Sequence, residues 1–312
     1  MPRTTPARIG LATALVSGLT AGLLATSSTT TSAAPSRRAP QPSHFTVSSF
    51  NVLGANHTPP GGRRASGATR IAWVNQLLNH HHVDVAGFQE LQPSQYTRLR
   101  AITKGSWGFY PGLGGQRKID SENSIGWRTD KFRLVHGTLV NIPYFDGRPR
   151  AMPLVLLRDQ RTGMLLYVAN YHNPADTRKH PHQGRWRRAA MRIEIALQNQ
   201  IMGHGIPRIM TGDMNERAEF FCHVTARTPL KAARPTSIRR NGVCQAGRPR
   251  SVDWILGNLR VDFSNYKEDR GPLVDRTTDH PMIVSDVTVS PSRMPRAWRY
   301  SPPPPVRPRV SR

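Results

Sequence analysis

Short apolar runs that each end in a polar residue are the feature that most constrains the fold of this chain. One run ends at Met210, is broken by Gly212, and leads to Asp213 and Asn215, which have a single residue between them. Since alternate residues of a strand share a face, we expect both side chains to leave the strand end on the same side. A carboxylate beside an amide can take a proton from water and hold an anion. The alternative is a turn in which Asn215 caps a helix that starts near Glu216.

Four further apolar runs also carry acids, amides or histidines. We expect strands at 44–53, 83–89, 164–169 and 251–256, with Asn51, Glu90, His172 and Asp253 as the associated polar residues. Glu90 stands at a strand exit, where it either ligates a hard cation or begins an exposed loop. His172 is a candidate general acid, with a plain loop residue as the alternative.

Asp253 lies inside an apolar run, where an unpaired carboxylate would be costly. Asp279 and His280, just before a last expected strand at 282–289, supply a partner. A carboxylate beside an imidazole raises the pKa of the histidine and fixes its tautomer, which makes a proton donor or a cationic clamp. We therefore expect Asp253 and His280 to touch although they are distant in sequence.

Helical spacing of apolar residues predicts two long helices. The first covers 70–81, and its apolar face consists of Ile71, Val74, Leu77 and Leu78. The second covers 186–202, and its expected apolar face consists of Ala189, Ile193, Ala196, Leu197 and Ile201. The end of the first helix carries His80, His81 and His82. Consecutive helical residues point in different directions and cannot all chelate one ion, so we expect a solvated helix end.

Positive charge extends over the whole chain. Residues 41–289 contain 34 Lys and Arg against 19 Asp and Glu, a net charge of +15. Such a field favours polyanions, nucleic acid above all, although an arginine-rich genome would produce the same balance. The densest basic stretch, 178–188, contains Arg185, Arg187 and Arg188 and leads into the second helix. These arginines either grip phosphate at the helix entrance or form a solvated loop.

The two ends of the chain differ from the part between them. Residues 1–40 combine a basic start, an interrupted apolar run and small residues near Ala33, which predicts a signal peptide, a short linker and a secreted, extracellular protein without stable membrane insertion. A membrane anchor is the alternative, but the run is short for a span. Residues 290–312 are rich in Pro and Arg and are expected to be disordered or polyproline-like. Residues 41–289 show no linker-like composition and are expected to form one catalytic domain.

Cys222 and Cys244 are the only cysteines. In an oxidising compartment a disulfide between them would close a loop of about 20 residues and contribute on the order of 3 kcal/mol. Zinc binding is the rival, but two cysteines without CxxC spacing are a poor zinc site. We predict the disulfide.

Six motifs in order along the chain resemble those of the endonuclease/exonuclease/phosphatase superfamily, the fold of pancreatic deoxyribonuclease, abasic-site endonucleases and bacterial sphingomyelinases. They are Asn51, Gln89-Glu90, Asn170-Tyr171-His172, Gly212-Asp213-Met214-Asn215, Asp253 and Thr278-Asp279-His280. The resemblance implies an α/β fold, a four-layer α/β/β/α sandwich with two packed mixed β-sheets and the site at one end of the strands.

The resemblance also implies a Mg²⁺-dependent phosphoester hydrolase, with Mn²⁺ or Ca²⁺ as other possible ions. By the pattern of the family, Glu90 is the main metal ligand, with Asn51 and Asp279 close by. The implied catalytic residues are Asp213 to activate water, Asn215 to hold a phosphate oxygen, His280 with Asp253 to stabilise the phosphorane, and His172 to assist the leaving group.

Three positions depart from the pattern of the family. Met214 replaces a Phe, Thr278 replaces a Ser while keeping the hydroxyl, and Leu53 stands where some relatives carry a second acid. The last departure favours a metal site with a single main carboxylate.

Three functions compete at this stage. A secreted metal-dependent nuclease that acts as a monomer on DNA or RNA is favoured by the motifs and the charge. A phosphatase or a sphingomyelinase-like phospholipid phosphodiesterase on the same scaffold is the alternative, although the sequence shows no convincing exposed apolar hairpin. A non-catalytic adhesion or nucleic-acid-binding protein is disfavoured because unused buried acids cost stability.

Overall fold

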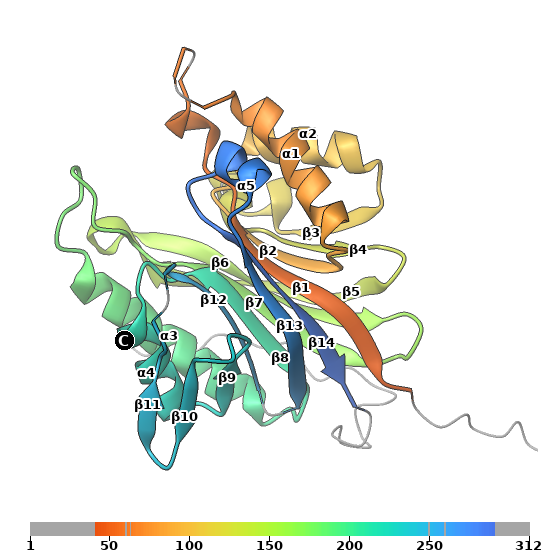
Figure 1. Ribbon diagram of the computed structural model, residues 1–312, viewed down its shortest axis with the longest axis vertical. Helices are drawn as coiled ribbons and strands as arrows, with labels where there is room; N and C mark the ends of the chain where they lie inside the picture. The colour runs from red at the N-terminus through yellow and green to blue at the C-terminus, as the bar shows by residue number, and fades with distance from the viewer. Residues whose placement is uncertain (1–40, 60, 63, 249, 259, 291–312) are drawn as a thin grey trace, which may run out of the picture. The chain divides into compact units, whose positions relative to one another are not determined.

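The computed structural model of the chain describes residues 41–290, except positions 60, 63, 249 and 259, and shows two packed six-stranded sheets (Figure 1). The first sheet has the order β13-β14-β1-β2-β4-β3 and consists of β1 (Ser43–Asn51), β2 (Val85–Gln89), β3 (Trp107–Tyr110), β4 (Ile125–Arg128), β13 (Val261–Asp269) and β14 (Met282–Val289). The second has the order β5-β6-β7-β8-β12-β9 and consists of β5 (Phe132–Pro143), β6 (Pro149–Asp159), β7 (Leu165–His172), β8 (Arg208–Asp213), β9 (Leu230–Ala232) and β12 (Asp253–Asn258). The pairs β1–β2 and β7–β8 are parallel and the other pairs are antiparallel, so both sheets are mixed.

Helices cover the outer faces of both sheets. They are α1 (Gly67–His80), α2 (Pro93–Thr103), α3 (Gly184–Met202), α4 (Ala218–Arg227) and α5 (Pro272–Thr277), with short 3₁₀ turns η1 (Ala55–His57), η2 (Gly112–Gly114), η3 (Lys118–Asn123) and η4 (Phe145–Gly147). Figure 1 shows α1, α2 and α5 on one side of the sheets and α3 and α4 on the other. The expected four-layer α/β/β/α sandwich is therefore confirmed.

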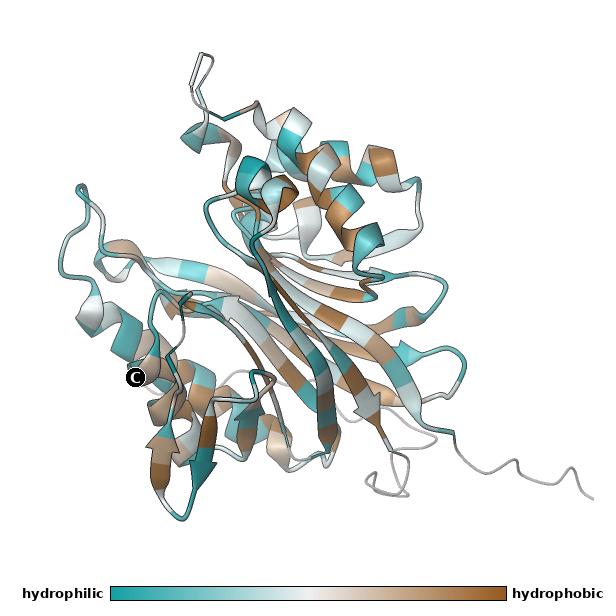
Figure 2. Ribbon diagram, viewed as in Figure 1, coloured by the Kyte–Doolittle hydropathy of each residue, from teal (hydrophilic) through white to brown (hydrophobic). Residues whose placement is uncertain are grey.

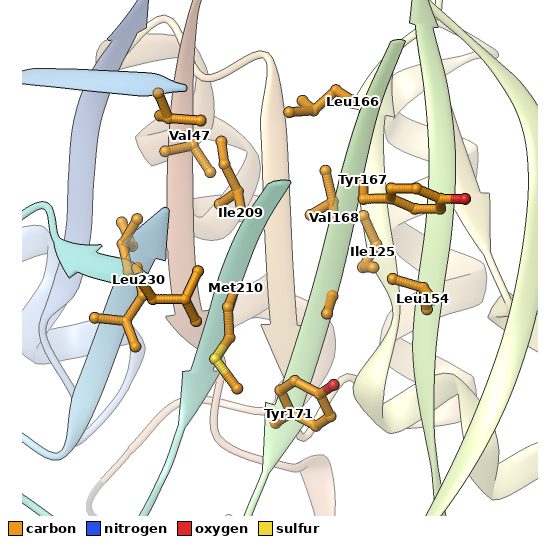
Figure 3. Close-up of a cluster of buried hydrophobic side chains, with 14 of the residues drawn as sticks. Val47, Ile125, Leu154, Leu166, Tyr167, Val168, Tyr171, Ile209, Met210 and Leu230 are labelled. Atoms are coloured by element: carbon orange, nitrogen blue, oxygen red, sulfur yellow. The ribbon is translucent and has the colours of Figure 1, made fainter. Parts of the chain in front are cut away.

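The alternation of side chains along each strand builds the core between the sheets. Val47 and Ile125 from the first sheet meet Val168 and Ile209 from the second (Figure 3). On the opposite face of β1, Phe50 belongs to a separate buried cluster that includes the apolar face of α1. Figure 2 shows the apolar residues concentrated along the strands and on the inward faces of the helices. Odd-numbered residues of β1 and β8 thus face the other sheet, which fixes where their last residues point.

The inward face of α3 differs from the predicted one. Ala196 is exposed and Ile193 is only partly buried, whereas Glu194 and Gln198 are fully buried. Burial raises the pKa of Glu194 to about 8. These polar side chains lie on the face of the helix that meets Tyr171, an outward-facing residue of β7 whose hydroxyl is also buried.

Several elements of the fold had no sequence-based prediction. They include the helices α2 and α5, the strands β3, β9 and β13, and the hairpin of β10 (Ile238–Arg240) and β11 (Val243–Gln245). The edge strand β13 also corrects the prediction for His81. Its Nε2 lies 2.7 Å from Asp269 Oδ2 and its side chain is only 7% exposed, so this end of α1 is not fully solvated. The reason is that β13 carries Asp269 over the helix end.

The predicted disulfide is present and joins Cys222 of α4 to Cys244 of β11, whose Cα atoms are 5.6 Å apart. Within the part of the chain that the structure describes, none of the helices combines the length and the apolar composition that a membrane crossing requires. The predicted signal peptide and the tail beyond Ser290 lie outside the described residues.

Candidate active site

Three neighbouring strands of the second sheet bring the central polar residues together at one end of the strands. His172 pairs with Asp213 across the parallel strands β7 and β8, and Asp253 pairs with Asp213 across the antiparallel strands β8 and β12. All three occupy strand positions whose side chains face the first sheet, where Asn51 ends β1. Strand register alone therefore assembles residues that are up to 81 positions apart.

Asp213 is the centre of this arrangement. Its Oδ2 accepts a hydrogen bond of 3.0 Å from Asn51 Nδ2 and lies 3.6 Å from the Nε2 atoms of both His172 and His280. Its Oδ1 accepts a hydrogen bond of 2.9 Å from the backbone N–H of Asn215. The residue is 1% exposed, so a carboxylate with several positive or donor neighbours is held away from bulk water. Such a carboxylate is well placed to orient and deprotonate a water molecule.

A buried polar network beneath Asp213 fixes the two sheets relative to each other. Gln89 Nε2 donates to Asn170 Oδ1 over 2.6 Å, and the same oxygen accepts from Thr211 Oγ1 over 3.1 Å. Asn170 Nδ2 also donates to the Phe88 carbonyl over 2.7 Å. Gly87 leaves the room for this network, because a Cβ at that position would lie 2.0 Å from Thr211 Oγ1. The network couples β2 to β7 and β8, whose ends carry the site.

The predicted contact between Asp253 and His280 is present. His280 Nδ1 lies 3.0 Å from Asp253 Oδ2 and 3.2 Å from Oδ1, and Asp253 is fully buried. Burial lowers the pKa of His280, but the carboxylates of Asp253 and Asp213 outweigh burial and raise it to about 10. His280 is therefore an imidazolium near neutral pH, with Nε2 directed toward Asp213.

Glu90 follows β2 in a left-handed backbone conformation with a φ of 61°. Its Oε1 accepts from Asn51 Nδ2 over 3.0 Å and its Oε2 accepts from the backbone N–H of Gly54 over 2.8 Å. Burial raises the pKa of Glu90, but His172, the Gly54 N–H and Asn51 outweigh it and lower the pKa overall. The result is an ionised carboxylate whose side chain remains 20% exposed.

The loop that carries Asp279 is attached to the end of β1. Thr278 Oγ1 donates to the Asn51 carbonyl over 2.8 Å, so the threonine hydroxyl attaches the loop to the strand. Asp279 itself is exposed. The arrangement brings one exposed acid and one ionised, partly exposed acid to the same strand end as the Asn51 amide. These are the oxygen ligands that a hard divalent ion takes.

A second group of residues could also hold a metal. Asp213, Asp253 and His280 each offer one ligand atom, and these atoms lie within 4.8 Å of one another. In this structure, however, both carboxylates face the His280 ring, and a protonated ring has no lone pair for a metal. The chemistry of the donors therefore favours Glu90 and Asn51 for the ion and leaves the histidine group for proton and phosphate chemistry.

Asn215 reaches the site through a turn. The strand β8 ends at Asp213 and Asn215 has a φ of 49°, so the strand alternation does not extend to it. Its Nδ2 donates to the Asn173 carbonyl over 2.8 Å. The alternative interpretation, in which Asn215 caps the next helix, is wrong because α4 begins at Ala218 after Arg217. One amide N–H of Asn215 is thus anchored and the other remains to bind an anion.

One wall of the site had no sequence-based prediction. Tyr144 Oη lies 3.5 Å from His172 Nε2, and the guanidinium of Arg150 lies 5.3 Å from the centre of the Tyr144 ring. Arg150 also forms an ion pair with Glu122. Single polar residues in an irregular segment and at the start of a strand give no periodic signal, so only the folded chain shows that they belong to the site.

The arginines of the basic stretch before α3 differ in their contacts, since Arg187 bonds within the fold and Arg185 and Arg188 are exposed. Arg187 donates to the Pro174 carbonyl over 3.0 Å and to Asp176 Oδ2 over 2.7 Å, so it holds the loop that follows β7. Arg185 is exposed and stacks on Trp186, and Arg188 is exposed with Glu219 at 3.7 Å. A cavity of about 550 Å³ lies among these arginines. Arg185 and Arg188 thus remain available to a ligand, whereas Arg187 has a structural role.

Two packed mixed sheets that carry a buried carboxylate, an imidazolium and an open carboxylate at one edge define an α/β sandwich hydrolase. The family model described as "Endonuclease/Exonuclease/phosphatase family" matches residues 48–286, so the chain belongs to this family. It is a phosphoesterase of that family with a possible divalent-metal site. No curated protein shows significant sequence similarity to the chain.

Solved structures with the same fold have low sequence identity to this chain. A Bacteroides vulgatus endonuclease/exonuclease/phosphatase has a TM-score of 0.65 and 18% identity, over 80% of this chain and 100% of that one. The human Nocturnin catalytic domain with bound sulfate has a TM-score of 0.62 and 16% identity, over 79% and 95%. A mannosyl-6-phosphatase from Bacteroides thetaiotaomicron has a TM-score of 0.59 and 16% identity, over 79% and 100%. These likenesses establish the fold alone.

Proposed function

We propose that the protein is a secreted, divalent-metal-dependent phosphodiesterase that hydrolyses DNA or RNA as an endonuclease. The observation that carries this proposal is the convergence of Asn51, His172 and His280 on the buried carboxylate of Asp213, next to Glu90. Phosphodiester hydrolysis needs a base for water, donors on the phosphate oxygens and a cation that neutralises charge, and this edge supplies residues for each task.

The residues of the chain divide the work as follows. Asp213 takes the proton of the attacking water, while the Asn51 amide and the Asn215 backbone N–H hold its carboxylate in place. Asn215 donates its remaining amide N–H to a phosphate oxygen. His280, kept charged by Asp253, donates from Nε2 to the phosphorane. His172, which lies against the Tyr144 hydroxyl, protonates or orients the leaving oxygen.

Glu90, Asn51 and Asp279 would hold Mg²⁺, with Mn²⁺ or Ca²⁺ accepted in its place. The fit rests on the ionised carboxylate of Glu90, whose neighbours are N–H donors and the His57 ring, 3.5 Å away. When bound, the ion neutralises charge on the phosphate and polarises its oxygens.

Nucleic acid is the substrate that the charge of the protein favours. The net charge of +15 over residues 41–289 attracts a polyanion, and the exposed Arg185 and Arg188 offer phosphate contacts beside the segment that leads from His172.

We further propose a monomer that is exported and cut near Ala33. Amino-terminal sequencing of protein from the culture medium and its hydrodynamic size check both points.

A phosphatase or a phospholipid phosphodiesterase is the alternative on this scaffold. The hairpin β10–β11 exposes Ile238 and Val243, but Figure 1 shows it at the opposite end of the sheets from α5, which leads directly into the Asp279 loop. A membrane bound by this hairpin would therefore lie away from the site. The geometry favours a substrate in solution.

The decisive experiment incubates the purified protein with plasmid DNA and with RNA, in Mg²⁺ and in EDTA. We expect cleavage in Mg²⁺, none in EDTA, and none with Glu90→Ala or His280→Ala in Mg²⁺. A double variant, Arg185→Ala with Arg188→Ala, should raise KM and leave kcat nearly unchanged, since these arginines lie outside the reacting groups. Intact nucleic acid with every divalent ion, together with release of phosphate or phosphocholine from small substrates, would establish the alternative instead.

A further inference from the structure

Arg70 of α1 is a fully buried arginine in the part of the fold that carries the proposed metal ligands. All five of its N–H groups have acceptors. Nε donates to the Ala65 carbonyl (3.0 Å), Nη1 to the carbonyls of Val52 (2.8 Å), Leu53 (2.7 Å) and Thr277 (3.0 Å), and Nη2 to the Gly54 carbonyl (3.2 Å) and Thr58 Oγ1 (3.0 Å). A single guanidinium therefore ties together segments that lie more than 200 residues apart in the chain.

None of the ion pairs among the described residues includes Arg70, although a buried charge without a counterion is costly. Burial lowers the pKa of Arg70 and nearby Arg64 adds to this, while Asp279 and Glu90 oppose it. Arginine nevertheless stays protonated in proteins. A full positive charge is thus fixed behind two of the proposed ligands without touching either one.

Four of the six acceptors of Arg70, the carbonyls of Val52, Leu53, Gly54 and Thr277, border groups that hold the proposed ligands. The backbone N–H of Leu53 donates to Asn51 Oδ1 over 3.0 Å, and that of Gly54 donates to Glu90 Oε2 over 2.8 Å. Thr277 directly precedes Thr278, whose hydroxyl binds the Asn51 carbonyl. The guanidinium is therefore connected to Asn51, Glu90 and the Asp279 loop by hydrogen bonds through short backbone segments.

We propose that Arg70 is the positioning residue of the metal site, which sets the spacing of the Asn51, Glu90 and Asp279 segments before an ion binds. This inference rests on the proposed metal-dependent function. The planar fork of arginine suits the task, because its donors diverge in fixed directions toward carbonyls of different segments. A lysine would keep the charge, but its three donors cannot serve all six acceptors. The charge and the geometry can thus be separated by substitution.

A second buried arginine provides a matched control. Arg208 begins β8, the strand that ends at Asp213, and is 1% exposed. Its Nε and Nη2 have no hydrogen-bond partner in the described structure. Arg208→Lys therefore tests the general cost of replacing a buried arginine at the far end of the same strand, without touching the proposed ligands.

The experiment measures Mn²⁺ binding by titration calorimetry and electron paramagnetic resonance, with the metal-free wild type, Arg70→Lys, Arg208→Lys and Thr58→Val. Far-ultraviolet circular dichroism first establishes that each variant is folded. We expect Arg70→Lys to weaken Mn²⁺ binding by about 10- to 100-fold, as is typical when a residue that orients metal ligands is lost. Thr58→Val, which removes one acceptor, should weaken binding by roughly 2- to 10-fold. Arg208→Lys should bind within about twofold of the wild type, since distant sites act independently.

The outcomes separate this inference from the proposed function. A wild type that binds no Mn²⁺ would overturn both. A wild type that binds while folded Arg70→Lys binds equally well would overturn only the role of Arg70. Equal losses in Arg70→Lys and Arg208→Lys would show a general effect of buried arginines and would also overturn it. If Arg70→Lys does not fold, Thr58→Val decides, and unchanged binding in that variant contradicts the proposal.

Discussion

The site has two halves, one around Asp253 and His280 and the other around Glu90, and the carboxylates in the two halves have opposite surroundings. Asp253 is fully buried and faces the His280 ring, so its charge is neutralised within the protein. Glu90 keeps part of its carboxylate exposed, and the donors around it are N–H groups and a histidine. The first half keeps a proton on His280, whereas the second keeps an anion open to an external cation. Acids of the same charge thus acquire different tasks from their neighbours.

The Asn51 amide joins the two halves. Its Nδ2 donates to Glu90 Oε1 and to Asp213 Oδ2, each over 3.0 Å. A neutral donor between two carboxylates reduces their repulsion before any ion binds. The buried Asp253–His280 pair, the Asn51 amide and the response of each half to pH can therefore be tested separately.

The largest effect is expected when the buried pair loses its charge. Asp253→Asn keeps the shape but removes the charge that raises the pKa of His280, so the imidazolium becomes scarce near neutral pH. We expect kcat to fall by about 10² to 10⁴ with little change in KM, by analogy with other histidine–carboxylate pairs. Steady-state kinetics on a nucleic-acid substrate measures the loss.

Asp275 on α5 is the matched control for that substitution. It is exposed and lies five residues before His280. Asp275→Asn should retain nearly wild-type kcat. Equal losses in the two variants, or full activity of Asp253→Asn at neutral pH, would show that the charge of the pair has no catalytic role.

An intermediate effect is expected at the Asn51 amide. Asn51→Asp replaces the shared donor by a third carboxylate, which faces both Glu90 and Asp213. Without metal, we expect the free energy of unfolding to fall by about 2 to 4 kcal/mol, because the buried Asp213 and the partly exposed Glu90 lose their donor and gain a like charge. Mg²⁺ should restore part of the loss. Urea unfolding with EDTA and with Mg²⁺ measures both. Equal stability of variant and wild type in EDTA would contradict the role of the Asn51 amide between the two carboxylates.

The smallest effect is the pH dependence of stability in metal-free protein. The folded-state pKa of His280 is raised to about 10 from the usual 6.5, so the stability it contributes is complete below 6.5 and is lost as the pH rises toward 10. The pKa of Glu90 is lowered, so its contribution is present above the usual 4.5 and is lost as the pH falls further. The His280 half should therefore lose its contribution to the free energy of unfolding at high pH, and the Glu90 half at low pH.

The measurement compares wild type with Asp253→Asn in EDTA. The stability advantage of the wild type should shrink by about 1 to 3 kcal/mol between pH 6.5 and 10. Glu194, whose pKa is raised to about 8 by burial, loses stability in an overlapping range, but it does so in both proteins and cancels in the difference. A constant difference across this range would mean that the pair holds no extra proton.

Much of the site could be predicted because local patterns dictate it. The alternation of β1 and β8 directs Asn51 and Asp213 to the same face, and the cost of an unpaired buried acid predicts a partner for Asp253. The contact with His280 follows that prediction. Strand alternation could not predict the direction of the Asn215 side chain, because the strand ends two residues earlier and a turn in the left-handed region redirects the chain.

The sequence by itself determined most of the central strands, the helices α1 and α3, the disulfide partners and the polar residues at the strand ends, since backbone periods of 2 and 3.6 are local properties. The tertiary structure alone decided which strands become neighbours. That choice places Asp269 over His81, Tyr171 against Glu194, and the Arg70 guanidinium among carbonyls from separate segments. Such contacts join residues that share no period, so they appear only when packing brings distant segments together.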